Sequence, residues 1–249
     1  MTEMDWASSF QKELNNIGLN LIGVADGSQY QHILAGCRSV LVIANTGSTL
    51  WDHFMKDCIQ DPSIFVTHQD PLDDWIQAKI QSLDPHPPSS RRWIRCASTD
   101  QFIDFRPLAE AAGLGHRSHL GLLIHPKYGL WISLRAAIFT TEYLPNTSHS
   151  IQSSPCLECE KHCAQHCPGN AFDQNGWNIS QCASFHQEST DCSESCISRL
   201  SCPIGTEFQH SVLAHHYHSN KESGRKAICS FLGVPDQTTA NSLSWKDWS

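Results

Sequence analysis

The chain has 249 residues, a formal net charge of −8 and 40% hydrophobic residues, which suffices for one large domain with an insert or for two domains. Nucleic acids are held through many phosphate contacts. The chain has no Lys/Arg-rich run, which disfavours tight binding to DNA, and its negative net charge also argues against binding to tRNA. The N-terminus lacks a basic stretch followed by an apolar one, and the longest apolar runs are too short to cross a bilayer. We therefore expect a cytoplasmic protein that does not bind membranes.

The first third of the chain predicts alternating helices and strands. Apolar spacing indicates helices over 5–16 and 71–83. Short apolar runs ended by turn residues predict strands over 19–25 and 39–47. Ser48 and Thr49 are suited to begin a helix that runs through Gln60.

The middle of the chain predicts more strand. Residues 93–98 and 101–105 look extended, and Pro107 favours the first turn of a helix over 106–113. Two apolar runs, 120–124 and 129–140, are separated by His-Pro-Lys-Tyr-Gly, which predicts a hairpin.

The last part begins at a polar, turn-rich boundary over residues 141–155. A cysteine-rich stretch follows, and helical patterns return after Thr206. The tail after Pro235 is polar and is expected to be loose, apart from Trp245 and Trp248.

Eight cysteines in this stretch are the main functional signal. Close-set cysteines, each group ending in Cys-Pro, are typical ligands of paired [4Fe–4S] clusters, in which each Cys-Pro cysteine often serves the other cluster. We expect Cys202 to complete one cluster and Cys167 to belong to the other. The predicted sets are Cys156, Cys159, Cys163 and Cys202, and Cys167, Cys182, Cys192 and Cys196.

The cysteine spacing leaves two alternatives open. One gap in the first group and two in the second are longer than in the usual C-x2-C-x2-C-x3-C-P run, and eight thiolates would also serve two zinc ions. A disulfide-rich insert is the other alternative, though the chain looks intracellular. Interleaved His162, His166 and His186 are expected to be solvated. The remaining cysteines, expected to be small buried hydrophobes, are Cys37, Cys58, Cys96 and Cys229.

Residues 104–135 carry a resemblance to a known family. Ala-Gly-Leu-Gly at 112–115, followed after six residues by Leu-Leu-Ile-His-Pro, resembles the cobalamin-binding domain of epoxyqueuosine reductases. Those enzymes, like the more distant reductive dehalogenases, also carry two [4Fe–4S] clusters after that domain. In the loop between the two motifs, His-Arg-Ser-His-Leu-Gly departs from the family pattern.

Segments 39–83, 124–138 and 215–234 resemble a second family, the cobalamin-processing CblC proteins. The two resemblances together imply an α+β fold: a nitroreductase-like (flavin-reductase-type) cobalamin-binding scaffold with a ferredoxin-like iron–sulfur insert. The implied division is a cobalamin domain over 1–148, the cluster region over 149–207, and a returning helix with the tail over 208–249.

The resemblance also implies site residues. Asp104 matches a proposed proton donor, which a buried carboxyl with a raised pKa could be, but it could equally cap the following helix. Arg135 matches an arginine that helps hold a thiol cosubstrate in CblC proteins, and it could instead be an ordinary strand residue. The cobalamin-binding candidates are Gly113, Gly115, His116, His119, Leu120, Gly121, Leu122, Ile124, His125 and Arg135.

Two histidine features have plain structural alternatives. His125 could bind cobalt or simply fix the predicted hairpin. Neighbouring His215, His216 and His218 point in different directions on a helix, so they cannot all bind one ion and are expected to be solvated or packed.

Three functions fit these observations. The leading hypothesis is an oxidoreductase that removes the upper axial ligand of cobalamin, as in reductive decyanation or dealkylation, with electrons from a ferredoxin- or flavodoxin-type donor system. The alternatives are a cob(I)alamin-dependent reductase of an external substrate, resembling epoxyqueuosine reductase, and a non-enzymatic cobalamin carrier with structural or redox-sensing clusters.

Overall fold

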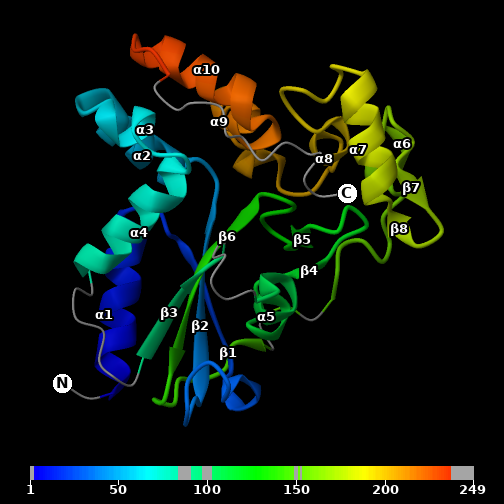
Figure 1. The fold of residues 1–249 in the computed structure, drawn as a ribbon. Helices are drawn as coiled ribbons and strands as arrows, with labels where there is room; N and C mark the ends of the chain where they lie inside the picture. The colour runs from blue at the N-terminus through cyan, green and yellow to red at the C-terminus, as the bar shows by residue number, and fades with distance from the viewer. Residues whose placement is uncertain (1–2, 84–90, 97–102, 149–150, 152, 237–249) are drawn as a thin grey trace.

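The centre of the computed structural model is a four-stranded antiparallel sheet (Figure 1). The structure describes residues 3–83, 91–96, 103–148, 151 and 153–236. The sheet order is β1 (Leu21–Asp26), β2 (Ser39–Thr46), β6 (Ile132–Thr140) and β3 (Arg91–Arg95). Every residue of β2 is buried, which suits a central strand rich in β-branched side chains.

One face of the sheet is covered by helices from both ends of the chain. They are α1 (Glu3–Asn16), α2 (Thr49–Gln60), α3 (Ser63–Val66), α4 (Pro71–Leu83), α9 (Val212–Ser219) and α10 (Lys221–Leu232). Trp51 of α2 packs against Phe54 and against Tyr217 of α9, with ring centroids 5.6 and 5.4 Å apart. Segments before and after the cysteines therefore share one apolar core.

Helix α10 is fixed at both ends and along its length. The Asn220 side chain accepts a hydrogen bond from the backbone N–H of Ser223 at its start, and Gly233 (φ 70°) ends it in the left-handed region. Buried Arg225 donates to the Phe65 and His68 carbonyls and lies 4.8 Å from the Phe65 ring centroid. These contacts hold the returning helix against α3.

The opposite face of the sheet carries α5 (Phe105–Ala111) and a small two-stranded sheet, β4 (His116–Arg117) with β5 (Leu123–Ile124). Phe105 and Leu108 pack on Val40, Val42 and other side chains of this face in a second apolar cluster.

The cysteine segment, residues 153–207, is built from short elements. They are α6 (His162–Gln165), β7 (Phe172–Asp173), β8 (Gly176–Trp177), α7 (Ile179–Glu188), α8 (Ile197–Leu200) and η3 (Thr206–Phe208). It docks on the chain just before β6 through a close backbone contact. A Cβ on Gly129 would lie 1.8 Å from the Ile204 carbonyl oxygen, and one on Gly205 would lie 2.4 Å from the Tyr128 carbonyl carbon. Both glycines have positive φ, so this junction requires glycine twice.

Most predicted elements are confirmed within a few residues, whereas the predicted hairpin is wrong. Strand β5 pairs with β4, and β6 pairs with β2 and β3, because the two apolar runs belong to different sheets. A single bridge between His125 and Gly129 closes the turn between them. Trp245 and Trp248 lie outside the described residues.

All twelve cysteines lie in the described part of the chain and are free thiols in the structure. Cys37, Cys58 and Cys229 are buried as predicted, but Cys96 is exposed just after the edge strand β3.

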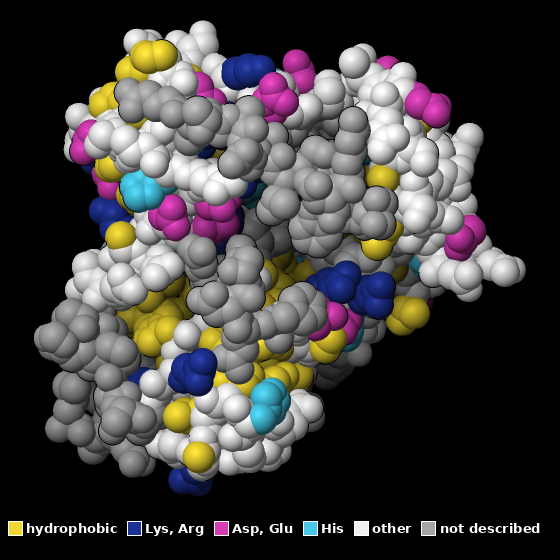
Figure 2. Space-filling model, in the orientation of Figure 1, with side chains coloured by type: hydrophobic (Ala, Val, Ile, Leu, Met, Phe, Trp, Pro, Cys, Tyr) yellow, Lys and Arg dark blue, Asp and Glu magenta, His cyan; other side chains and the backbone are white. Residues whose placement is uncertain are grey.

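Among the described residues, no helix combines the length and apolar character needed to cross a membrane. On the face in Figure 2, Lys and Arg side chains form small separate groups, and hydrophobic side chains show across its middle.

Candidate functional site

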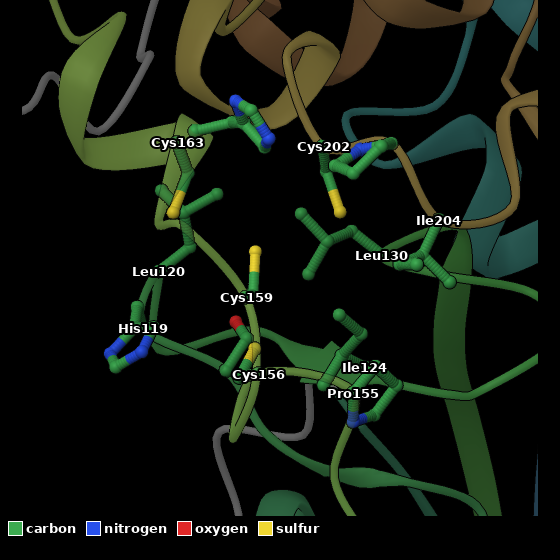
Figure 3. A pocket seen from close by; sticks show the side chains of 13 residues that line it. His119, Leu120, Ile124, Leu130, Pro155, Cys156, Cys159, Cys163, Cys202 and Ile204 are labelled. Carbon is green, nitrogen blue, oxygen red and sulfur yellow. The ribbon is translucent and has the colours of Figure 1, made fainter.

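The first predicted cysteine set is brought together by the fold. Cys156, Cys159, Cys163 and Cys202 line one pocket, and Figure 3 shows the thiols of Cys159, Cys163 and Cys202 facing a common space. The rest of its wall comprises Ser118, His119, Leu120, Ile124, Leu130, Pro155, His162, Pro203 and Ile204. The pocket is therefore closed partly by the cysteine segment and partly by the chain around β4 and β5.

The longer gap between Cys159 and Cys163 is absorbed by a local bulge. Lys161 has φ 59° and ψ 46°, the left-handed conformation, and its carbonyl accepts from the backbone N–H of Ala164. This reversal starts α6 and turns Cys163 back toward the pocket. The extra residue thus does not prevent the predicted grouping.

The second predicted set comes from four separate pieces of chain. Cys182 lies in α7 and Cys196 caps α8, while the Cys167 sulfur accepts from the Ala171 backbone N–H at 3.3 Å. Burial raises the pKa of the Cys182 thiol, and the nearby thiols of Cys196, Cys167 and Cys192 raise it further.

Each predicted set offers four thiols as donors for a metal centre. Burial is the main cause of the raised pKa of Cys163, Cys196 and Cys202, and a metal centre that binds thiolates would offset this cost. Within the described ranges, no three His, Cys, Asp or Glu side chains are grouped to hold a single metal ion. A [4Fe–4S] cube is larger than one ion and spreads its four sulfur ligands more widely.

Three of the predicted cobalamin-binding residues lie instead at the first cysteine set. His119, Leu120 and Ile124 line that pocket. His116 pairs with Ile124 across the small sheet, and its Nε2 atom is buried without a partner among the described residues. Leu122 is 38% exposed.

The predicted glycines serve close backbone packing. Gly113 (φ 68°) ends α5, and its N–H bonds to the Glu110 carbonyl. A Cβ on Gly115 would lie 2.6 Å from the Ile124 carbonyl oxygen, and one on Gly121 would lie 3.3 Å from the Trp177 ring. In this structure, the groups that closely approach Gly115 and Gly121 belong to β5 and to the cysteine segment.

His125 fixes the turn before β6. Its Nδ1 atom accepts from the backbone N–H groups of Lys127 and Tyr128, and its ring packs on Tyr128 with centroids 4.5 Å apart. Burial, with the Lys127 charge, lowers its pKa. The neutral ring therefore holds its proton on Nε2.

Asp104 is exposed at the start of α5. Its carboxylate accepts from the Arg106 backbone N–H at 3.1 Å and pairs with the Arg106 guanidinium. The hydrogen bond from the Arg106 side chain is the main cause of a lowered pKa. The buried carboxyl with a raised pKa that we considered is not observed, and the helix-cap alternative is.

Arg135 lies apart from the other cobalamin-binding candidates, on β6 under α4. Its Nε donates to the Asn45 side chain at 2.8 Å, and its Nη1 lies 3.7 Å from the Asp73 carboxylate. Burial lowers its pKa, although the Asp73 charge opposes this.

A buried polar cluster beside Trp131 was not predicted from the sequence. The rings of His210 and His215 lie 5.6 and 5.2 Å from the Trp131 ring. Buried nitrogens without a partner among the described residues are Trp131 Nε1, His210 Nε2, His215 Nε2 and Arg199 Nε. His216 instead bonds Ser223. The expectation that His215, His216 and His218 point in different directions is therefore confirmed for His216.

The spacing of His215 and His218 could have indicated that their side chains lie on the same side of a helix. His215 and His218 are three residues apart, hence neighbours on a helix surface. The centroid of the His210 ring lies 5.7 Å from that of His215 and 5.8 Å from that of His218. Burial, followed by the Arg199 charge, lowers the pKa of His210 to about 3.

Comparisons with known proteins support the predicted resemblance. No family model matches the chain. An epoxyqueuosine reductase of Listeria monocytogenes is 32% identical over 84 residues, which are 34% of this chain. The match spans only 21% of that enzyme.

Solved structures share the fold at low sequence identity. An epoxyqueuosine reductase from Bacillus subtilis superposes with a TM-score of 0.56 and 17% identity, over 85% of this chain and 68% of that one. The Caenorhabditis elegans B12-trafficking protein CblC gives a TM-score of 0.53 and 12% identity, over 95% and 99%.

A third structure, an epoxyqueuosine reductase with a tRNA-Tyr stem loop, gives a TM-score of 0.52 and 15% identity, over 85% and 68%. The charge argument against tRNA therefore does not decide that question. The mixed α and β architecture and the similarity to epoxyqueuosine reductases and CblC proteins, both predicted from the sequence, are confirmed.

Proposed function

We propose that this protein is an iron–sulfur reductase that acts on cobalamin and removes its upper axial ligand. The observation that supports the proposal is the pocket lined by Cys156, Cys159, Cys163 and Cys202, in a chain whose fold is shared with epoxyqueuosine reductases and CblC. The nitroreductase-type ancestry of the scaffold and the ferredoxin-like character of the insert are part of this proposal.

The eight cysteines would hold two [4Fe–4S] clusters, which supply one-electron transfer when bound. Leu120, Ile124 and Leu130 give the pocket of the first thiol set an apolar wall. An external ferredoxin- or flavodoxin-type system would supply the electrons.

Cobalamin would be the substrate. One electron added to a cyanocobalamin substrate takes cobalt from Co(III) to Co(II) and releases cyanide as an anion. The candidate contacts remain those implied by resemblance, namely Gly113, Gly115, His116, His119, Leu120, Gly121, Leu122, Ile124, His125 and Arg135. Arg135, with its partners Asn45 and Asp73, would act by positioning substrate.

The test is an anaerobic assay of cyanocobalamin with the purified protein and a competent electron donor. Loss of the cyano-form absorption spectrum supports the proposal, and an unchanged spectrum contradicts it. Iron and sulfide quantification should give about eight irons per chain, from two clusters of four.

A matched pair of variants tests whether the cysteine sets are required. Cys202→Ala removes a thiol from the first set, whereas Cys229→Ala removes a buried thiol of α10. The first variant should lose cluster iron and activity, and the second should keep both.

The Listeria match and the tRNA-bound neighbour favour a second candidate, reduction of an external substrate such as epoxyqueuosine in tRNA. Turnover of an epoxyqueuosine-bearing tRNA stem loop, without loss of cyanide from cyanocobalamin, would select it. Binding of cobalamin without either activity would indicate a carrier.

A further inference from the structure

Ser118 directly follows β4 and lines the pocket of the first cysteine set, together with all four cysteines of that set. The next two residues, His119 and Leu120, line the pocket as well. Ser118 therefore belongs to the wall that the chain outside the cysteine segment contributes to this pocket.

Backbone hydrogen bonds fix Ser118 in the turn between β4 and β5. Its N–H donates to the Leu122 carbonyl at 2.8 Å, and its own carbonyl accepts from the Gly121 N–H at 3.0 Å. Gly121 has φ 70°, a conformation that glycine adopts without strain. Because both backbone groups of Ser118 are used within the turn, its hydroxyl is the group left to bind a partner in the pocket.

The Ser118 hydroxyl is buried, and it makes no hydrogen bond within the described part of the chain. The residue is 9% exposed, and its Oγ atom is inaccessible to solvent. A hydroxyl can donate one hydrogen bond, and its hydrogen rotates to suit the acceptor. Burial of an unpaired hydroxyl is costly, so an acceptor bound in the pocket would offset that cost.

The composition of the wall indicates which acceptor this is. Of the described residues that line the pocket, Ser118 alone carries a side-chain oxygen, while Leu120, Ile124 and Leu130 are apolar. A [4Fe–4S] cluster held by the four thiols would bring sulfur acceptors, both inorganic sulfide and cysteine sulfur. These are the acceptors that the four-cysteine pocket itself implies.

We propose that the Ser118 hydroxyl donates a hydrogen bond to a sulfur of the first cluster and raises the reduction potential of that cluster. This inference rests on the proposed function, because it needs the first cluster to be present. Reduction adds one negative charge to a cluster, and a hydrogen bond to a more negative acceptor is stronger. Hydrogen bonds to sulfur are among the factors that set such potentials.

The test is an EPR-monitored redox titration of the intact protein and of two variants. Ser118→Ala removes the hydroxyl and should shift the first cluster to a more negative potential. Ser118→Thr keeps a hydroxyl and should stay closer to wild type. Cys202→Ala, which removes a ligand of the first set, assigns the signal of the first cluster by its loss.

Thr46→Val is the matched control. Thr46 also carries a buried hydroxyl without a partner among the described residues, but it lies at the end of β2 and is not part of the pocket wall. Its removal should leave the potential of the first cluster unchanged. A shift in Ser118→Ala no larger than in Thr46→Val overturns the inference.

Pulsed hyperfine spectroscopy of the reduced protein in H2O and in D2O gives a second readout. A hydroxyl proton exchanges with the solvent, so the exchangeable-proton signal at the first cluster should weaken in Ser118→Ala and persist in Thr46→Val. An equal signal in the two variants contradicts the proposed hydrogen bond.

Metal content separates this failure from failure of the proposed function. Bound iron whose first-cluster signal does not respond to Ser118→Ala would reject the inference and leave the proposed reductase intact. A Ser118 effect in a protein that leaves cyanocobalamin unchanged would support the inference and reject the proposed activity. A chain that binds no iron would overturn both.

Discussion

The sheet domain, which comprises the four-stranded sheet and the helices that cover it, is held together differently from the cysteine segment. Its faces bury large apolar clusters, including Trp51, Phe54 and Phe65. The cysteine segment has helices as short as four residues and shares one small cluster around Leu120 and Leu130. Apolar burial alone can stabilise the first region, whereas the second would depend on the metal centres proposed above.

Removal of iron should produce the largest difference in stability between the two regions. After chelation, we expect residues 156–202 to become the preferred site of proteolysis, while the sheet domain resists. Limited proteolysis with mass spectrometry checks this. Cleavage spread equally over both regions would show that the two are stabilised alike.

A core truncation should affect the sheet domain next most strongly. Phe54 is fully buried and packs on Phe65 and Trp75, so Phe54→Ala should lower the free energy of unfolding by about 3–5 kcal/mol. Phe231→Ala, on the exposed side of α10, is the control. Chemical denaturation measures both, and equal losses would contradict the packing described.

Acidification should weaken the junction between the two regions. The pKa of His210 is lowered to about 3 in the folded protein, mainly by burial, against about 6.5 when unfolded. The unfolded state therefore binds the proton first, and stability falls as pH drops below 6.5, by up to about 1.4 kcal/mol per pH unit.

Unfolding measured between pH 6.5 and 5 tests this dependence. His210→Gln should flatten the slope of stability against pH. His216→Gln, a change on α9 at a histidine bonded to Ser223, should retain it. A wild-type slope in His210→Gln would contradict the assignment.

The smallest effect is expected at Asp104. Asparagine preserves the helix cap, so Asp104→Asn removes only the charge pair with Arg106, whose side chains are 42% and 49% exposed. The loss of stability should stay below about 1 kcal/mol. A larger loss would mean that the carboxylate has a further structural partner, and thermal unfolding measures it.

Local sequence signals predicted the local structure well. β-branched residues marked β2, amphipathic spacing marked α4, and the two Cys-Pro steps placed Cys202 with Cys156. The partner of β5 escaped prediction, because an apolar run does not say which strand it pairs with. Cys96 likewise looked like its buried counterparts, although its place after an edge strand exposes it.

The long-range parts of the site were beyond the sequence. Arg199 reads as an ordinary basic residue until the fold sets it on Trp131, 68 positions earlier in the chain. Arg135 and the 113–125 segment were expected together, yet they lie apart because β6 carries Arg135 under α4. Such relations depend on which surfaces the chain brings into contact.

The return of α9 and α10 has a consequence for biosynthesis. A chain leaving the ribosome presents Trp51 and Phe65 before Tyr217 and Arg225 exist to cover them. Cys156 through Cys202 emerge during that interval. Under the proposed function, iron delivery and completion of the apolar core would overlap in time, and a cell short of iron would accumulate chains with both tasks unfinished.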